Sequence, residues 1–140
     1  MPSQEIHEIA KAWIKHAHDL IKHAHDLTVD EDADGFAWAW EKAFDLKYEN
    51  PALLWQLILE IHAQDQSNEV AEVLSAGPLE DLLSEHGQEF IEPIEKQAQQ
   101  DPSFAFLLGG VWQSSMTEEI WQRVQKVWDR RGWDGSPKES

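Results

Sequence analysis

A run of acidic residues in the first third of the chain has the spacing of a calcium-binding loop. Asp30, Asp32, Asp34, Gly35 and Glu41 match the EF-hand pattern D-x-D-x-D-G-x5-E. In such a loop the carboxylates supply hard oxygen ligands and the glycine makes the sharp turn. The residues before the loop lack the apolar spacing of an EF-hand's incoming helix, and the chain contains no second loop. The same residues therefore also fit an acidic linker in which Asp34 caps the next helix.

The string KHAHDL occurs twice just upstream, at residues 15–20 and 22–27. Seven residues make nearly two helical turns, so a helix would place both copies on the same face. One edge of that helix would carry His16, Asp19, His23 and Asp26, and the other edge would carry His18 and His25. The first of these edges, with His16, Asp19, His23 and Asp26, has ligand spacings compatible with a zinc or nickel site. Duplication of a coding segment explains the pattern equally well.

Two histidines lie close to carboxylates in the sequence and could form an acid–base pair. His62 precedes Asp65, and His86 follows Glu85. No nucleophile elbow, zinc-protease motif, phosphate loop or dinucleotide fingerprint occurs, and the chain has no cysteine. An enzyme stays an alternative, but no residue is predicted to be catalytic.

The negative charge of the chain is unevenly distributed. The formal net charge is −16 at pH 7. Residues 51–95 contain no lysine or arginine, whereas acids recur throughout them: Glu60, Asp65, Glu69, Glu72, Glu80, Asp81, Glu85, Glu89, Glu92 and Glu95. Such a surface repels nucleic-acid phosphates and attracts a basic protein. The same acidic residues would also be found on helices that simply face water and keep the protein soluble, without any partner.

Eight tryptophans are many for 140 residues. Five lie on apolar stripes and are predicted to be core: Trp13, Trp55, Trp112, Trp121 and Trp128. The other three, Trp38, Trp40 and Trp133, are less clearly buried, and tryptophan is enriched at binding hot spots. The predicted binding residues are Trp38, Trp40, Glu80, Asp81 and Glu85. They favour a protein that binds a basic partner, of an immunity or inhibitor type.

The elements that carry these residues are predicted to be about eight helices and no strand. Residues 4–27 form a long amphipathic helix, and residues 36–48 form a second helix that is expected to turn Trp40, Ala43 and Phe44 inward. Further helices are predicted from residue 51, over residues 69–76 and from residue 102 through Trp112. Two helix starts are predicted where a capping residue precedes a first-turn proline, at Asn50 with Pro51 and at Asp101 with Pro102. Gly77 with Pro78 predicts a helix end and restart, and Gly87 predicts another end.

Two glycines and a final helix complete this prediction. Gly109 and Gly110 are expected where another backbone approaches closely. The last helix, residues 117–130, is expected to open with a capping box of Ser115 and Glu118.

An internal repeat of 51 residues relates the two cap-and-proline pairs. Pro51 aligns with Pro102, and each proline opens a strongly apolar helix. We expect antiparallel helical hairpins stacked as a short, right-handed, HEAT-like array. Residues 1–132 would form a single domain, and residues 133–140 a disordered tail.

Several strings resemble an uncharacterised bacterial family, a domain of unknown function. They are GPLEDLL, HG followed by EFI, DPSF, LLGGVW and WQRV, and the resemblance covers roughly residues 8–128. It implies a bacterial protein of about this size and supplies no catalytic residues. The chain lacks a signal-peptide pattern and any apolar run of membrane-spanning length, so we expect a cytoplasmic protein with no membrane partner. No cofactor is predicted unless the acidic loop binds calcium; a calcium- or transition-metal-binding protein is the alternative function.

Overall fold

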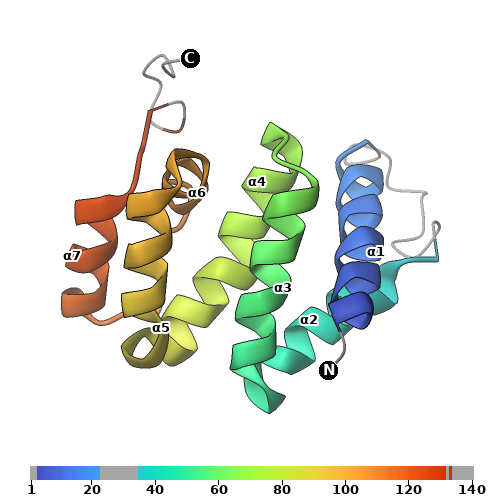
Figure 1. Ribbon diagram of the computed structural model, residues 1–140, viewed down its shortest axis with the longest axis horizontal. Helices are drawn as coiled ribbons and strands as arrows, with labels where there is room; N and C mark the ends of the chain where they lie inside the picture. Colours follow the sequence, from blue (N-terminus) through green and yellow to red (C-terminus); the bar gives the residue numbers. More distant parts are fainter. Residues whose placement is uncertain (1–2, 23–34, 132, 134–140) are drawn as a thin grey trace. The chain divides into compact units, whose positions relative to one another are not determined.

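The computed structural model describes residues 3–22, 35–131 and 133, and these form helices without any strand among them (Figure 1). The predicted all-α fold class is confirmed. Contacts divide the chain into two compact units, Met1–Val73, here unit 1, and Leu74–Ser140, here unit 2. None of the described helices is apolar over the length that a membrane span requires.

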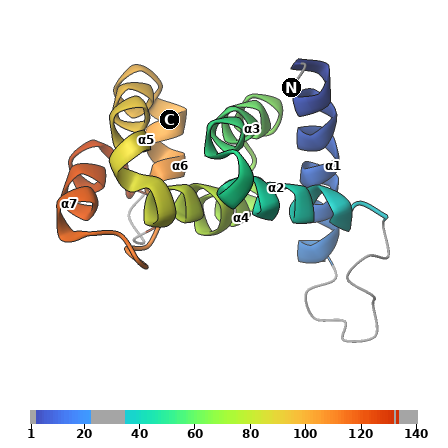
Figure 2. The same cartoon turned by 90° about the horizontal axis from the view of Figure 1, so that it is seen from below.

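Unit 1 is built around three helices, α1 (Ser3–Lys22), α2 (Ala37–Glu49) and α3 (Pro51–Gln64). Each packs against the other two (Figures 1 and 2). The apolar stripe predicted for α1 is buried as far as Ala17, with Trp13 almost fully enclosed. Leu54, Leu57 and Ile58 supply the facing core of α3. Residues 23–34, which hold all of the second KHAHDL copy except Lys22, lie outside the described part.

The orientation of α2 differs from the prediction. We expected Phe44 to point inward with Ala43, but Ala39, Ala43 and Leu46 are the buried apolar residues, and Phe44 is 55% exposed. The alanines allow α2 to approach α1 and α3 closely. Phe44 follows Ala43 by one residue, about 100° around the helix, and so points away from the core.

Both predicted cap-and-proline starts are confirmed. Asn50 accepts a hydrogen bond from the Leu53 N–H at 3.3 Å and opens α3. Asp101 accepts one from the Ser103 N–H at 3.0 Å and opens α6 (Pro102–Leu108). These side chains satisfy backbone donors that a helix start leaves without partners.

The predicted break at Gly77 and Pro78 is wrong. Helix α4 (Asn68–Leu74) is followed by a π-helical segment, η1 (Ser75–Leu79), and then by α5 (Glu80–Gln100). Gly77 and Pro78 lie inside η1, whose wider turns accommodate a residue without an N–H. The end predicted at Gly87 falls at a kink that joins two helical parts of α5, because His86 takes the non-helical angles φ −136° and ψ 29°.

Unit 2 centres on α5, which packs against both α6 and α7 (Glu118–Val127). Leu82, Ile91 and Ile94 of α5 are buried with most of α6 and with Ile120 and Val124 of α7. The guanidinium of Arg123 on α7 donates two hydrogen bonds to the Glu95 carboxylate on α5. The capping box with Ser115 is wrong, because Thr117 is the cap and accepts from the Ile120 N–H at 3.2 Å.

The close approach of another backbone is confirmed at Gly109, whereas at Gly110 side chains approach instead. A Cβ on Gly109 would lie 2.1 Å from the backbone oxygen of Asp129, and one on Gly110 would lie 2.4 Å from Ser75 Oγ. The chain leaving α7 causes the first contact: Asp129 N donates to Ala105 O at 2.9 Å, and Arg130 donates to Gly109 O at 2.9 Å. Trp133 then stacks on Phe106, with ring centroids 5.1 Å apart.

Candidate functional site

The outer side of α2 exposes three large aromatic side chains. Trp38, Phe44 and Tyr48 are 48%, 55% and 60% exposed. Glu41 and Asp45 are exposed on the same side, because residues three and four apart are neighbours on a helix. We call these five residues the α2 face. Large aromatic groups gathered at the surface are informative, since folding normally buries them.

The aromatic rings of the α2 face already contact a cation. Phe44 and Tyr48 meet edge to face, with ring centroids 5.8 Å apart and an interplanar angle of 75°. The Lys47 ammonium lies 4.3 Å from the Phe44 ring centroid and 4.9 Å from that of Tyr48. Positive charge is attracted to the faces of such rings, so this pair has the electronic character of a cation-binding surface.

A shallow, open hollow adjoins these rings. Trp40, Glu41, Phe44 and Asp45 line it, and it encloses about 400 Å³. Trp40 is held in place: its Nε1 donates to Trp13 O at 3.1 Å, its ring stacks on Trp13, and the His16 ring meets it edge-on at 4.9 Å. The two tryptophans predicted to bind thus have different roles, Trp38 as an exposed side chain and Trp40 as an anchored wall.

The histidines of the first KHAHDL copy are tied to other elements of unit 1. His16 is buried against Trp40, and His18 Nε2 donates to Asp65 Oδ2 at 2.8 Å. The described part of the chain contains no group of three or more metal-binding side chains. His23, Asp26 and His25 lie outside the described residues, so the predicted zinc or nickel site stays a prediction.

Two histidine–carboxylate contacts join α1 to α3, and neither was found from the sequence. One is His18 with Asp65; the other is His7, whose Nδ1 lies 3.3 Å from Glu60 Oε2. Gln64 strengthens the second by donating to Glu60 Oε2 at 2.9 Å and to His7 O at 3.1 Å. The partners are about fifty residues apart in sequence, so only the packing of α1 on α3 reveals them.

Asp65 is held in its ionised form. Partial burial opposes ionisation, but hydrogen bonds from His18 and from Ser67 outweigh it and hold the pKa of Asp65 below its ordinary value of 3.8. The Ser67 N–H donates to Asp65 Oδ1 at 2.8 Å, and Ser67 Oγ accepts from the Val70 N–H at 3.3 Å. Asp65 therefore stabilises both the α1–α3 contact and the start of α4.

The predicted binding acids Glu80, Asp81 and Glu85 lie in unit 2, in the first turns of α5. Glu80 Oε1 accepts from the Trp112 N–H at 2.8 Å. Trp112 is 70% exposed, so its predicted place in the core is wrong. The reason is that α6 ends at Leu108; Val111 and Met116 then point inward, and Trp112 between them points outward.

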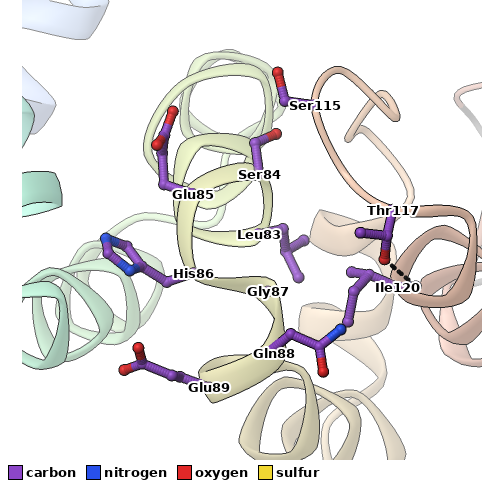
Figure 3. A pocket seen from close by; sticks show the side chains of 10 residues that line it. All are labelled: Leu83, Ser84, Glu85, His86, Gly87, Gln88, Glu89, Ser115, Thr117 and Ile120. Carbon is purple, nitrogen blue, oxygen red and sulfur yellow. Dashed lines mark hydrogen bonds between the residues drawn. The ribbon is translucent and has the colours of Figure 1, made fainter.

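A second hollow, of about 250 Å³, lies at the bend of α5 (Figure 3). Figure 3 shows Glu85, His86 and Glu89 along one side and Ser115, Thr117 and Ile120 on the other, with the Gly87 backbone between them. We call this the α5 hollow. It contains Glu85 of the predicted binding residues and His86 of the predicted acid–base pair.

The predicted calcium loop lies largely outside the described residues, since Asp30, Asp32 and Asp34 fall within residues 23–34. Of its other members, Glu41 is exposed on α2. Gly35 has φ 74°, in the left-handed region that a sharp turn at this position requires.

Comparisons with known proteins place the chain in a family. No curated protein and no solved structure matches it. The family model of DUF6869, described as a family of unknown function, matches residues 26–132. This match confirms the resemblance to an uncharacterised family that the sequence strings suggested, and the chain belongs to DUF6869.

Proposed function

We propose that the protein is a non-enzymatic binding module whose α2 face binds a basic segment of a partner protein. The observation that carries this proposal is the exposure of Trp38, Phe44 and Tyr48 beside the carboxylates of Glu41 and Asp45. An immunity or inhibitor protein would act in this way, by covering a basic site of its partner.

The α2 face combines two sources of binding free energy. Aromatic side chains release much ordered water on burial and lose little conformational entropy, because they have few rotatable bonds. Arginine and lysine can stack on the rings while the carboxylates accept their hydrogen bonds. The net charge of −16 would speed the approach of a basic partner.

The proposal is tested with a fluorescently labelled peptide of alternating arginine and glycine. We expect fluorescence anisotropy to show saturable binding, and the paired change Phe44→Ser with Tyr48→Ser to weaken it at least about tenfold, as for a hot spot. Both side chains are exposed, so thermal unfolding should change little.

Trp112→Ser provides the matched control, because it removes an exposed aromatic side chain from unit 2. It should leave binding of the arginine peptide to the α2 face unchanged. A peptide in which glutamate replaces arginine should not bind. Equal affinity of the wild-type protein and the Phe44/Tyr48 variant for the arginine peptide would refute the proposal.

A further inference from the structure

We infer that one face of α6 is a peptide-binding site, which the chain's own segment after α7 occupies and closes. This α6 face consists of Ala105, Phe106, Gly109 and Gly110, and the closing segment, here the strap, consists of residues 129–131 and 133. The ligand is a short peptide of a partner protein that carries an arginine three residues before a tryptophan, as the strap itself does. The α6 face lies in unit 2, so this site is additional to the α2 face in unit 1.

Two side chains of the strap donate hydrogen bonds to main-chain oxygens at the end of α6. Arg130 Nη1 donates to Gly109 O at 2.9 Å, and Trp133 Nε1 donates to Phe106 O at 2.7 Å. Carbonyl groups at the end of a helix lack a full set of partners within the helix, and the negative end of the helix dipole favours a cation. A guanidinium and an indole N–H, three residues apart, are therefore the donors that this face accepts.

The missing side chains at Gly109 and Gly110 leave room for the indole ring of Trp133. A Cβ on Gly109 would lie 3.0 Å from Trp133 Cδ1, and a Cβ on Gly110 would lie 2.8 Å from Cη2 of the same ring. The indole also stacks on Phe106, with ring centroids 5.1 Å apart and an interplanar angle of 29°. Of the natural side chains, only tryptophan combines a flat ring of this size with an N–H donor. The α6 face therefore selects tryptophan at this position of the ligand.

The strap is shaped by contacts within itself. The Arg131 guanidinium donates two hydrogen bonds to the Asp129 carboxylate, each at 2.9 Å, and the Arg131 N–H donates to Asp129 Oδ1 at 3.1 Å. Asp129 N in turn donates to Ala105 O at 2.9 Å, where the strap begins. Because the Asp129–Arg131 contacts join residues two apart, a free peptide of the same sequence can form them. Such preorganisation lowers the entropy that the peptide loses on binding.

The strap continues the chain beyond α7 without forming a helix (Figure 1). Helix α7 is held on α5 by Arg123 with Glu95 and by the buried Ile120 and Val124, so it does not depend on the strap. Trp133 is only partly buried, which leaves solvent access to the strap. A tethered segment has an effective concentration of about a millimolar or more, so it excludes a free peptide until it is withdrawn.

The inference is tested by amide NMR of the ¹⁵N-labelled full chain during titration with the capped peptide Asp-Arg-Arg-Gly-Trp, which copies residues 129–133. Trp133→Ser removes the indole and opens the α6 face. We expect saturable shifts at Phe106, Gly109 and Gly110 in this variant, with an affinity at least about tenfold higher than in the wild-type chain, where the strap competes.

Two controls separate the α6 face from general attraction between a basic peptide and an acidic chain. The peptide Arg-Trp-Asp-Gly-Arg has the same composition in another order and should leave the signals of Gly109 and Gly110 unmoved. Trp112→Ser removes an exposed tryptophan outside the face and should behave as the wild-type chain does. Adding the Phe44/Tyr48 double change to Trp133→Ser should leave binding at the α6 face intact, so each site is tested separately.

A second variant keeps the test decisive if far-UV circular dichroism shows that Trp133→Ser loses helix. Trp133→Phe keeps a ring on Phe106 and loses the indole donor, so it should bind the peptide with an affinity between those of the wild-type chain and Trp133→Ser. Absence of shifts at Gly109 and Gly110 in both variants, or equal affinity for the two peptides, would overturn the inference. Exchange of straps between two copies, seen as a dimer of the wild-type chain, would also overturn it.

Discussion

The ionisation of Asp65 shows how a single residue links two contacts in unit 1. Its carboxylate accepts hydrogen bonds from His18 and Ser67, and these keep its pKa below the ordinary value of 3.8. Because the folded state lowers this pKa, the stabilisation is complete above pH 3.8 and is lost as the pH falls through the lower, folded-state pKa.

We therefore expect Asp65→Asn to lower the free energy of unfolding near neutral pH by up to about 1 kcal/mol, since the group is largely solvent-screened. The loss should shrink as the pH falls below 3.8 and through the lower, folded-state pKa, where the wild-type carboxylate also becomes protonated. Urea unfolding at several pH values measures this. Asp45→Asn, which removes the same charge from an exposed position on α2, is the control. A loss for Asp65→Asn that does not depend on pH would contradict the assignment.

Calcium binding by the predicted loop would depend on ligands that are held in place before the ion binds. Its upstream residues lack the apolar spacing of an EF-hand helix, and the chain has no second loop, so the ligands would not be preorganised. We expect a calcium titration to give no saturable change in tryptophan fluorescence in the micromolar range, where Trp38 and Trp40 would report binding. A saturable change that Asp30→Ala abolishes would establish the loop as a calcium site.

Individual side chains were predicted less well than the helices that carry them. Trp13 follows the stripe of α1 into the core, as expected. Phe44 and Trp112 were expected inside and are exposed. An apolar pattern gives the period of a helix, but it does not show that alanines make the contact in α2, nor that α6 stops four residues before Trp112.

At the scale of elements, both cap-and-proline starts were predicted correctly, whereas the capping box expected at Ser115 was wrong because Thr117 caps α7. Asn50 and Asp101 cap their helices through hydrogen bonds to nearby N–H groups, so short-range sequence is sufficient to predict them. Gly77 and Pro78 were misread, because the π-helical segment η1 continues through them. The HEAT-like stacking of hairpins stays a prediction.

Two glycines give opposite predictions for the same substitution. A methyl group at Gly109 would meet the Asp129 backbone oxygen at 2.1 Å, and neither main chain can yield easily. We expect Gly109→Ala to destabilise unit 2 by at least about 2 kcal/mol, as overpacking of a buried site does. Gly77 has no atom within 4 Å of an added Cβ and lies in helical backbone, so Gly77→Ala should stabilise by about 0.4–1 kcal/mol.

Chemical denaturation of both glycine variants measures the difference between them. The wild-type protein is the reference, and far-UV circular dichroism confirms that each variant keeps its helices. Equal effects of the two substitutions would contradict the close packing described at Gly109.

At the scale of the whole molecule, charge and exposed aromatic surface support the binding proposal through different observables. The charge of −16 acts over a distance and is screened by salt, whereas the α2 face acts on contact. The sequence showed the acidic character of the chain and singled out Trp38 of the α2 face. It could not predict Phe44 and Tyr48, because their exposure depends on how α2 packs against α1 and α3.

The most direct measurement is an amide and indole NMR map of the ¹⁵N-labelled full chain during titration with the arginine–glycine peptide. The α2 face should respond first, with shifts at Glu41, Phe44, Asp45 and the Trp38 indole that saturate together and weaken as salt is added. If the α2 signals stay unmoved at peptide concentrations that saturate the anisotropy, the α2 face is not the binding site and the central claim is wrong.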